Sequence, residues 1–247
     1  MLIPFEPKIF DYTINIHLVL EYAAFFAAFR YYVFLRKRTN DHISEGNRLS
    51  IIIGAVFGAF IGSRFLAYLE CPSSIGSPSD FIQILNNKTI MGGLFGGLLG
   101  VELAKKIINE KQASGDLFTF PLILGIFIGR IGCFLSGTKE FTYGETTNFF
   151  MGMDLGDGLN RHPVALYELI FLLILYFFLK KIQRSNRLES GGLFKYFMLA
   201  YFGFRFFIEF LKPNIFYFSK LSSIQWLCIL CWMYYLNELK KIRKYAR

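Results

Sequence analysis

The sequence predicts an all-α integral membrane protein with seven transmembrane helices, and its composition and apolar runs support this fold class. Apolar residues fill 54% of the 247 positions, phenylalanine alone occurs 30 times, and the mean hydropathy is +0.41. These residues gather in long runs, each close to the ~20 residues that a helix needs to cross a bilayer. The seven runs cover residues 14–35, 49–69, 90–108, 117–137, 163–182, 193–211 and 222–239. No soluble segment or clear repeat is left over, so we expect one domain over residues 1–247.

The lysines and arginines predict the orientation of these helices. Most of them lie in the loops after the first, third and fifth runs and in the C-terminal tail, whereas the other loops hold few. Because cytoplasmic loops are enriched in basic residues, we expect the N-terminus outside and the C-terminus in the cytoplasm. Topology therefore explains the net charge of +9, and nucleic acid is not expected as a partner.

The stretch from Gly129 to Gly137 places Arg130 inside the fourth apolar run. Burying a charge in a bilayer costs about 2.5–3.5 kcal/mol even on the most lenient scale, so something must compensate this arginine. Gly125, Gly129 and Gly132 leave one flank of the predicted helix as bare backbone. Two interpretations remain open: close helix packing with a structural ion pair, or an anion site that the backbone approaches closely.

The predicted topology brings polar residues from six runs to the outer half of the membrane. They are His17, Glu21 and Tyr22 in the first run, Arg64 in the second, Met91 in the third, Arg130 in the fourth, the 162–168 segment in the fifth, and Arg205 and Glu209 in the sixth. We therefore expect an outward-facing polar cavity with at least three arginines, Arg64 included.

Two pairs of polar residues are spaced four apart, which puts each pair on one helix face. Arg205 and Glu209 form either a self-neutralising ion pair or an arginine held by its carboxylate and aimed at a phosphate. We favour the second because the arginines outnumber the obvious acids. His17 and Glu21 form either a polar patch or an acid–base pair in which Glu21 orients the imidazole.

Small residues form stripes in the second and third runs, which is typical of close helix packing. The stripes are Gly54, Gly58 and Gly62, and Gly92, Gly96 and Gly100. An alternative for the start of the third run is that the bare backbone of Gly92 and Gly93 touches a lipid headgroup.

The fifth run opens with residues that could take part in chemistry. Glu168 lies one turn into the predicted helix and is a candidate partner for an arginine, and Tyr167 is a candidate interface anchor. His162 titrates near neutrality, so it is either structural or a proton carrier. The preceding loop, residues 138–162, contains Tyr143-Gly144 and is the longest outside loop, as is typical of functional lids.

The cysteines predict no disulfide framework and no metal site. Cys228 and Cys231 form a C-x-x-C, but it lies inside an apolar run, which disfavours a redox or metal role. Cys71 and Cys133 complete the set. We expect no cofactor.

Taken together, several motifs resemble those of the bacterial prolipoprotein diacylglyceryl transferases. They are G-G-L-F-G-G at 92–97, G-R-I-G-C-F-L-S-G at 129–137, T-Y-G at 142–144, R-H-P-V-A-L-Y-E at 161–168 and R-F-F-I-E-F at 205–210. Met91 stands where the family usually has histidine, and Cys133 where it usually has asparagine. The signature loop is also longer than in the commonest members. The chain is similar to a variant branch that carries G-R-I-G-C-F.

The resemblance implies transfer of the diacylglyceryl group of phosphatidylglycerol to the lipobox cysteine of prelipoproteins, with release of glycerol phosphate. The partners would be phosphatidylglycerol, prelipoprotein signal peptides and membrane lipids, and the location the bacterial inner membrane with the site facing the outer leaflet. Alternatives are a diverged member acting on another anionic phospholipid or acceptor, and a transporter or receptor for an anionic amphiphile. A transporter should show polar residues through both leaflets, whereas here the predicted set is one-sided.

The candidate site follows from the residues and the resemblance together. Arg130 and Arg205 meet the need for cations at the leaving phosphate, since charge builds there. Because the acceptor supplies its own thiol, we expect Cys133 to be a packing residue, and with Met91 unable to act as base we assign that role to His17, held by Glu21. The candidate catalytic residues are Arg130, Arg205, Glu209, His162, His17 and Glu21. The candidate substrate-binding residues are Arg64, Gly92, Gly93, Cys133, Tyr143, Gly144, Tyr167 and Glu168.

Overall fold

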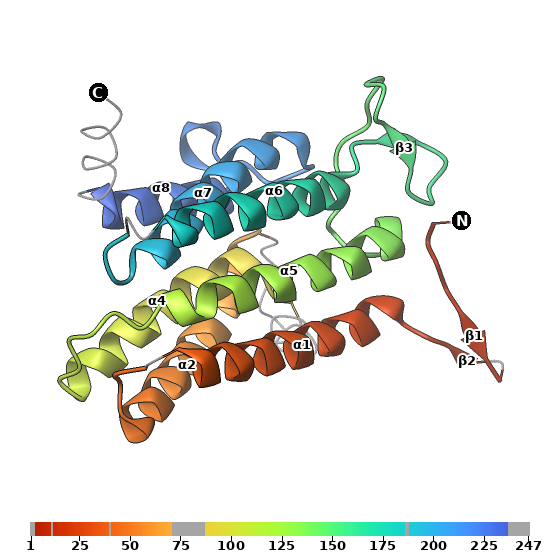
Figure 1. Ribbon diagram of the computed structural model, residues 1–247. Helices are drawn as coiled ribbons and strands as arrows, with labels where there is room; N and C mark the ends of the chain where they lie inside the picture. The colour runs from red at the N-terminus through yellow and green to blue at the C-terminus, as the bar shows by residue number, and fades with distance from the viewer. Residues whose placement is uncertain (1–2, 11, 40, 71–86, 186–187, 237–247) are drawn as a thin grey trace, which may run out of the picture. The chain divides into compact units, whose positions relative to one another are not determined.

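The computed structural model describes residues 3–10, 12–39, 41–70, 87–185 and 188–236 (Figure 1). These residues contain seven α-helices, and each coincides with one predicted apolar run. The helices are α1 (Ile16–Arg38), α2 (Glu45–Glu70), α4 (Ile90–Ile107), α5 (Asp116–Ser136), α6 (Val164–Arg184), α7 (Gly192–Ile208) and α8 (Ser223–Tyr234). The predicted all-α class is confirmed at this level.

The remaining elements are short. Strands β1 (Lys8–Ile9) and β2 (Tyr12–Thr13) form one antiparallel pair, and β3 (Met153–Asp154) and β4 (Asn160–Arg161) form another. Three single turns of 3-10 helix complete the description: η1 (Gly137–Lys139), η2 (Glu209–Leu211) and η3 (Phe218–Lys220).

The helices have the length and surface of membrane segments. Among the described residues, α1, α2 and the stretch Asp116–Lys139 are long and apolar enough to cross a bilayer. Large apolar side chains also face outward: Phe25, Phe26 and Phe29 of α1 are 61–69% exposed. Apolar surface of this extent on several helices indicates contact with lipid. The protein is therefore a membrane protein, while the number of spans and their orientation stay predictions.

Contacts between Cα atoms divide the chain into two compact units, which are described separately. The first unit consists of Met1–Asn40, Gly115–Phe197 and Phe210–Pro213. The second consists of Asp41–Ser114, Met198–Glu209 and Asn214–Arg247. Helix α7 therefore contributes residues to both. The single domain over residues 1–247 stays a prediction.

In the first unit α5 is the central helix, with α1 and α6 packed against it (Figure 1). Asn15 caps the start of α1, where its side chain accepts a hydrogen bond from the Leu18 N–H at 3.0 Å. Asp116, at the start of α5, also organises the start of α7, because its carboxylate accepts the N–H groups of Gly191 at 2.7 Å and Phe194 at 3.0 Å. These contacts use side chains to satisfy backbone donors that a helix start leaves open.

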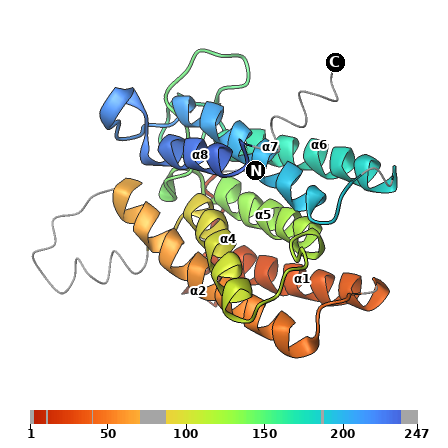
Figure 2. The same cartoon turned by 90° about the vertical axis from the view of Figure 1, so that its left-hand side faces the viewer.

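In the second unit α2 and α4 pack together through the two glycine stripes (Figure 2). A Cβ atom built on Gly58 would lie 2.2 Å from the Gly96 carbonyl oxygen, and one on Gly62 would lie 2.4 Å from that of Gly92. The same holds for Gly54 against the Gly100 carbonyl oxygen at 2.6 Å. No side chain fits between backbones this close, so the packing interpretation of both stripes is confirmed.

The glycine contact predicts a sharp difference between two neighbouring residues of α4. A Cβ on Gly96 would lie 2.3 Å from the Gly58 carbonyl oxygen, whereas one on Gly97 would meet its nearest neighbour at 3.5 Å. We expect Gly96→Ala to destabilise the protein by about 1–3 kcal/mol, because the two helices must separate. Gly97→Ala should be neutral or slightly stabilising, since alanine favours the helix.

The measurement is denaturant unfolding in detergent, followed by circular dichroism. Equal midpoints for the two variants would contradict the assigned packing.

Candidate functional site

Arg130 is buried in the first unit and paired with a buried carboxylate. Its guanidinium lies on α5 with 7% of the residue exposed, and its Nε atom is 2.8 Å from Oε1 of Glu168 on α6. Glu168 has no exposed surface. The predicted role of Glu168 as partner of an arginine is confirmed, and the pair offsets part of the cost of burying each charge.

Cys133 lies one turn beyond Arg130 and contacts its guanidinium. The Arg130 Nη1 group donates to the Cys133 sulfur at 3.6 Å. Helices α5 and α6 thus bring Cys133, Arg130 and Glu168 into one cluster, which we call the arginine–thiol cluster.

Glycines of α5 let α1 approach this cluster. A Cβ on Gly132 would lie 3.3 Å from the His17 Cα atom, and one on Gly125 would lie 3.2 Å from the Ala28 Cβ atom. A Cβ on Gly129 would meet nothing within 4 Å. The packing interpretation is therefore confirmed for Gly125 and Gly132, and Gly129 does not share it.

No hydrogen bond joins His17 to Glu21 among the described residues. The Nδ1 atom of His17 is buried and has no hydrogen-bond partner among these residues. The spacing of four residues puts both side chains on one helix face, and the assignment of His17 as a base oriented by Glu21 stays a prediction.

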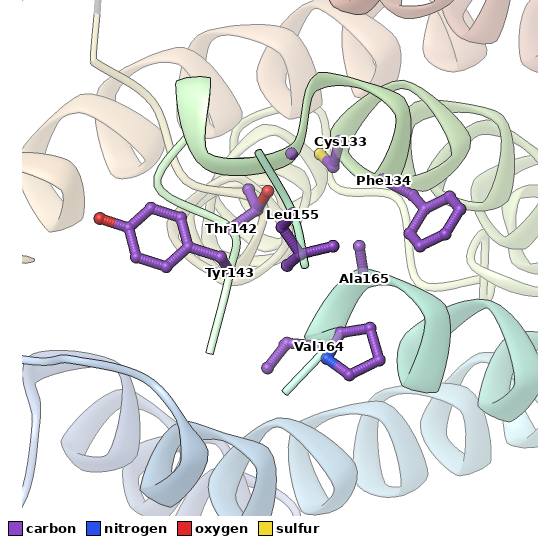
Figure 3. A pocket seen from close by; sticks show the side chains of 9 residues that line it. Cys133, Phe134, Thr142, Tyr143, Leu155, Val164 and Ala165 are labelled. Carbon is purple, nitrogen blue, oxygen red and sulfur yellow. The ribbon is translucent and has the colours of Figure 1, made fainter. Parts of the chain in front are cut away.

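A small pocket opens beside the cluster, at the end of α5 (Figure 3). Figure 3 shows that its walls come from α5, the following loop and the start of α6, with Cys133, Tyr143 and Ala165 among them. Tyr143 also lies against the Arg161 guanidinium, which is 5.0 Å from its ring centroid. Such a contact between a cation and a ring face is attractive and orders the loop.

Gly144 marks the point where three chain segments cross. Its N–H donates to the His162 carbonyl at 3.0 Å, and the next N–H, of Glu145, donates to the Leu211 carbonyl at 2.7 Å. A Cβ on Gly144 would lie 2.6 Å from the His162 Cβ atom and 2.9 Å from the Leu211 carbonyl oxygen. The sequence assigned Gly144 to substrate contact, whereas the structure gives it a packing role that only glycine can fill.

The rest of the loop is ordered by local contacts. His162 Nδ1 is 3.2 Å from the hydroxyl of Tyr167, so these two predicted site residues orient each other. Arg161 Nε donates to Asp157 at 2.7 Å. This hydrogen bond holds the pKa of the Asp157 carboxyl below its ordinary value, because it stabilises the charged form.

The second unit contains the other predicted ion pair. Arg205 and Glu209 form a salt bridge and are 4% and 0% exposed. The Asn214 amide donates to Glu209 Oε2 at 2.7 Å and to its backbone carbonyl at 2.8 Å. The pair was predicted from its spacing, whereas Asn214 was missed, since the only signal was its place just after the R-F-F-I-E-F motif.

The remaining predicted residues of the second unit have packing contacts. The backbone of Gly62 occupies the space over Gly92, with its carbonyl oxygen 2.2 Å from a Cβ built there, so Gly92 packs against α2, and its contact with a headgroup stays a prediction. Gly93 is in ordinary contact with Ser63. Arg64 donates to the Ser63 hydroxyl at 3.0 Å and lies 4.8 Å from the Phe60 ring centroid.

Two further cysteines and one lysine are also buried. Cys228 and Cys231 are free thiols buried in α8, and Cys71 lies outside the described residues. Lys212 was missed by the sequence reasoning. It is 4% exposed, with its ammonium 5.2 Å from the Phe141 ring centroid. A lysine directly after a membrane-length run is an ordinary topological signal, so nothing marked it as buried.

The fold and the ion pairs define an all-α membrane protein that holds two buried arginines beside carboxylates. The chain belongs to the prolipoprotein diacylglyceryl transferase family, whose sequence model matches residues 7–237.

Similar proteins carry the name phosphatidylglycerol–prolipoprotein diacylglyceryl transferase. The protein of Nitratidesulfovibrio vulgaris strain Hildenborough is 32% identical over 175 residues, which cover 67% of this chain and 63% of that relative. The protein of Wolbachia pipientis wMel is 32% identical over 73% of this chain and 72% of its own length. That of Finegoldia magna is 29% identical over 79% and 78%. The match to the first of these relatives thus spans slightly less than two thirds of it.

The Arg130–Glu168 pair predicts a large effect of removing one partner. Glu168→Gln should destabilise the protein by about 3–5 kcal/mol, because it leaves a buried guanidinium without its carboxylate. The double variant Arg130→Met with Glu168→Met should recover most of that loss, since no charge is then buried. Asp157→Asn, which breaks the partly exposed pair with Arg161, should have a far smaller effect.

Unfolding midpoints of the purified variants check this. A double variant as unstable as Glu168→Gln would show that the pair is not the source of the loss.

Proposed function

We propose that this protein transfers the diacylglyceryl group of phosphatidylglycerol to the cysteine thiol of a prelipoprotein. Family membership and the names of the relatives support this activity. The observation that carries it is the arginine–thiol cluster beside a small pocket, because it lies on the segment that carries the family signature.

The proposed reaction is a displacement at carbon. The acceptor sulfur forms a bond to the glyceryl carbon, the carbon–oxygen bond to the phosphate breaks, and the thiol proton passes to a base. Glycerol phosphate leaves with the bonding electron pair, so negative charge builds on its phosphate oxygens. A fixed cation at those oxygens lowers the barrier, since its interaction is stronger in the transition state than in the ground state.

We propose Arg130 as a cation that binds the phosphate. The original reason, an excess of arginines over acids, is wrong, because Arg130 and Arg205 each have a carboxylate partner. The revised reason is that Glu168 fixes the guanidinium through Nε. A planar fork of N–H donors can then bind an oxyanion through its other edge. Arg205 is proposed for the same type of contact in the second unit, because its salt bridge with Glu209 likewise fixes the guanidinium.

The membrane arrangement belongs to this proposal. We place seven spans in the bacterial inner membrane, with the N-terminus outside and the site open to the outer leaflet, because the basic loops support that orientation. Within the first unit, the end of α5 and the start of α6 meet at the arginine–thiol cluster, and the start of α1 lies against Gly132 of α5. Phosphatidylglycerol, prelipoprotein signal peptides and membrane lipids are the proposed partners.

The direct test is complementation of a transferase-depleted bacterium, with the electrophoretic mobility of a prelipoprotein as readout. Growth together with the mobility shift supports the proposal. Failure of both, with the protein present in the membrane, would favour a member that uses another lipid or acceptor. A transporter of an anionic amphiphile would instead move labelled lipid across vesicles without forming a thioether.

The phosphate contact predicts the effect of two conservative substitutions. Arg130→Lys and Arg205→Lys should each insert into the membrane and lose at least about tenfold in kcat/KM. Lysine keeps the charge but cannot offer the planar two-pronged contact. Arg184→Lys, at an exposed position of α6, is the matched control and should be unaffected. Full activity in both site variants would remove the arginines from the proposed role.

The identity of the base predicts a difference in pH dependence. A neutral imidazole accepts the thiol proton, so the rate should rise with pH through the ordinary imidazole pKa of ~6.5 and be lost below it. His17→Gln should abolish that rise, whereas His162→Gln should keep it, because His162 faces Tyr167. The measurement is transferase activity between pH 5 and 9 (roughly the range in which histidine titrates). An unchanged profile in His17→Gln would leave the cavity's positive charge as the simpler source of thiolate.

A further inference from the structure

We infer that Asn214 is a positioning residue, which holds the carboxylate of Glu209 and through it sets the guanidinium of Arg205. The inference rests on the proposed function for its meaning in catalysis, because Arg205 is there assigned to the phosphate. The arrangement itself can be tested without any turnover. All three residues belong to the second unit.

The two oxygens of the Glu209 carboxylate have different partners. Oε1 forms the salt bridge with Nη2 of Arg205, and Oε2 accepts a hydrogen bond from the Asn214 amide at 2.7 Å. The same amide nitrogen donates to the Glu209 backbone carbonyl at 2.8 Å. A carboxylate held at one oxygen can still rotate, whereas one held at both oxygens must break a contact to do so. The amide of Asn214 therefore fixes the plane in which Glu209 meets Arg205.

The orientation of the amide follows from its partners. The ionised carboxylate and the backbone carbonyl of Glu209 can only accept hydrogen bonds, so the NH2 group of Asn214 must face them. This group has two protons, one for each acceptor. The Oδ1 atom is buried and has no hydrogen-bond partner among the described residues. Within this part of the chain, the hydrogen bonds of the Asn214 side chain therefore all go to Glu209.

Burial makes these contacts important for Arg205. Glu209 has no exposed surface and Arg205 is 4% exposed, so water cannot replace a lost donor. Hydrogen bonds to an ionised group are about twice as strong as those between neutral groups. A buried oxygen that loses its donor pays the full cost of its desolvation. Without Asn214 the carboxylate should therefore turn toward another donor and change the geometry of its salt bridge.

The segment after Asn214 is itself held within the second unit. Phe216 pairs with Ser222 in an antiparallel bridge, and Ser222 caps the start of α8 by accepting the Gln225 N–H at 3.2 Å. The side-chain amide of Gln225 donates to the Phe206 carbonyl of α7 at 3.1 Å. These contacts connect the end of α7 to the start of α8. Asn214 lies at the beginning of the segment between them, so its backbone is fixed from both sides.

A purely structural role is the competing explanation, because Asn214 also satisfies a backbone carbonyl beyond the end of α7. The two roles differ in what a substitution changes. If Asn214 only completes the helix end, its loss should reduce activity by the same factor whichever residue stands at position 205. If Asn214 acts through Arg205, its loss should matter only while the arginine is present.

The first experiment observes the guanidinium directly, by 15N-arginine NMR of the protein in phosphatidylglycerol nanodiscs. With signals assigned from Arg205→Lys and Arg130→Lys, Asn214→Leu should shift the Arg205 Nε signal and speed the rotation of its guanidinium. Leucine is close to asparagine in shape but cannot donate. Asn214→Ala removes the same donor with a smaller side chain and supplies the comparison if the leucine variant does not fold.

Two controls accompany this measurement. The Arg130 signal, from the first unit, should not change in either Asn214 variant. Asn47→Leu removes another asparagine–glutamate hydrogen bond of the second unit, to Glu110 at 3.0 Å, and should leave the Arg205 signal unchanged. An Arg205 signal that is identical in wild type and in the folded Asn214 variant would overturn the inference.

The second experiment measures the consequence for the reaction with a double-mutant cycle. Asn214→Leu should lose about tenfold in kcat/KM, because a misplaced group costs much of its effect on the transition state. In the Arg205→Lys background the same substitution should change kcat/KM by less than about twofold. Asn47→Leu should stay within about twofold of its parent in both backgrounds.

The outcomes of the cycle separate the two roles. An equal loss from Asn214→Leu in both backgrounds would establish a structural role alone. A loss confined to the background with Arg205 supports positioning. If the wild type shows no transfer at all, the proposed function fails, and the NMR comparison still decides whether Asn214 positions Arg205.

Discussion

The buried pairing of arginine with carboxylate is the constraint on which the rest of the structure depends. A guanidinium buried away from water is costly, and α6 offsets part of that cost for Arg130 by presenting Glu168 at 2.8 Å. That pairing fixes the rotation of α6 about its own axis relative to α5. It also places the segment before α6, with His162 and the crossing at Gly144, against the end of α5. The polar site is thus also the element that specifies how the first unit packs.

Glycine supplies the second constraint, because apolar surfaces alone give little preference for one helix arrangement in lipid. Gly132 lets α1 reach the cluster, and the stripe from Gly54 to Gly62 locks α2 onto α4. Gly144 acts in the same way outside the helices, where a Cβ would collide with His162. Each glycine permits a close approach of two backbone segments and so fixes how those segments pack.

The sequence predicted the parts of this arrangement that depend on spacing within one helix. The seven helices follow from the apolar runs, and the Arg205–Glu209 pair follows from a spacing of four. The partner of Arg130 was named only as a candidate, because it lies on another helix. The spacing within α1 paired His17 with Glu21, but it did not show that His17 lies against Gly132 of α5, because the approach of α1 to α5 cannot be derived from α1 alone. Contacts between two helices depend on how the helices pack against each other. A single sequence does not show which residues of the two helices face each other.

The two departures from the common family signature acquire a physical meaning when they are considered together. Met91 is 1% exposed, and a thioether cannot take up a proton, so the position that usually holds histidine supplies no base here. Cys133 replaces an amide with a thiol that accepts a hydrogen bond from Arg130 Nη1 at 3.6 Å. The carbonyl oxygen of an asparagine side chain could accept from the same guanidinium, so both residues can make this contact. The first departure therefore removes a group that can carry a proton, whereas the second keeps a hydrogen-bond acceptor beside Arg130.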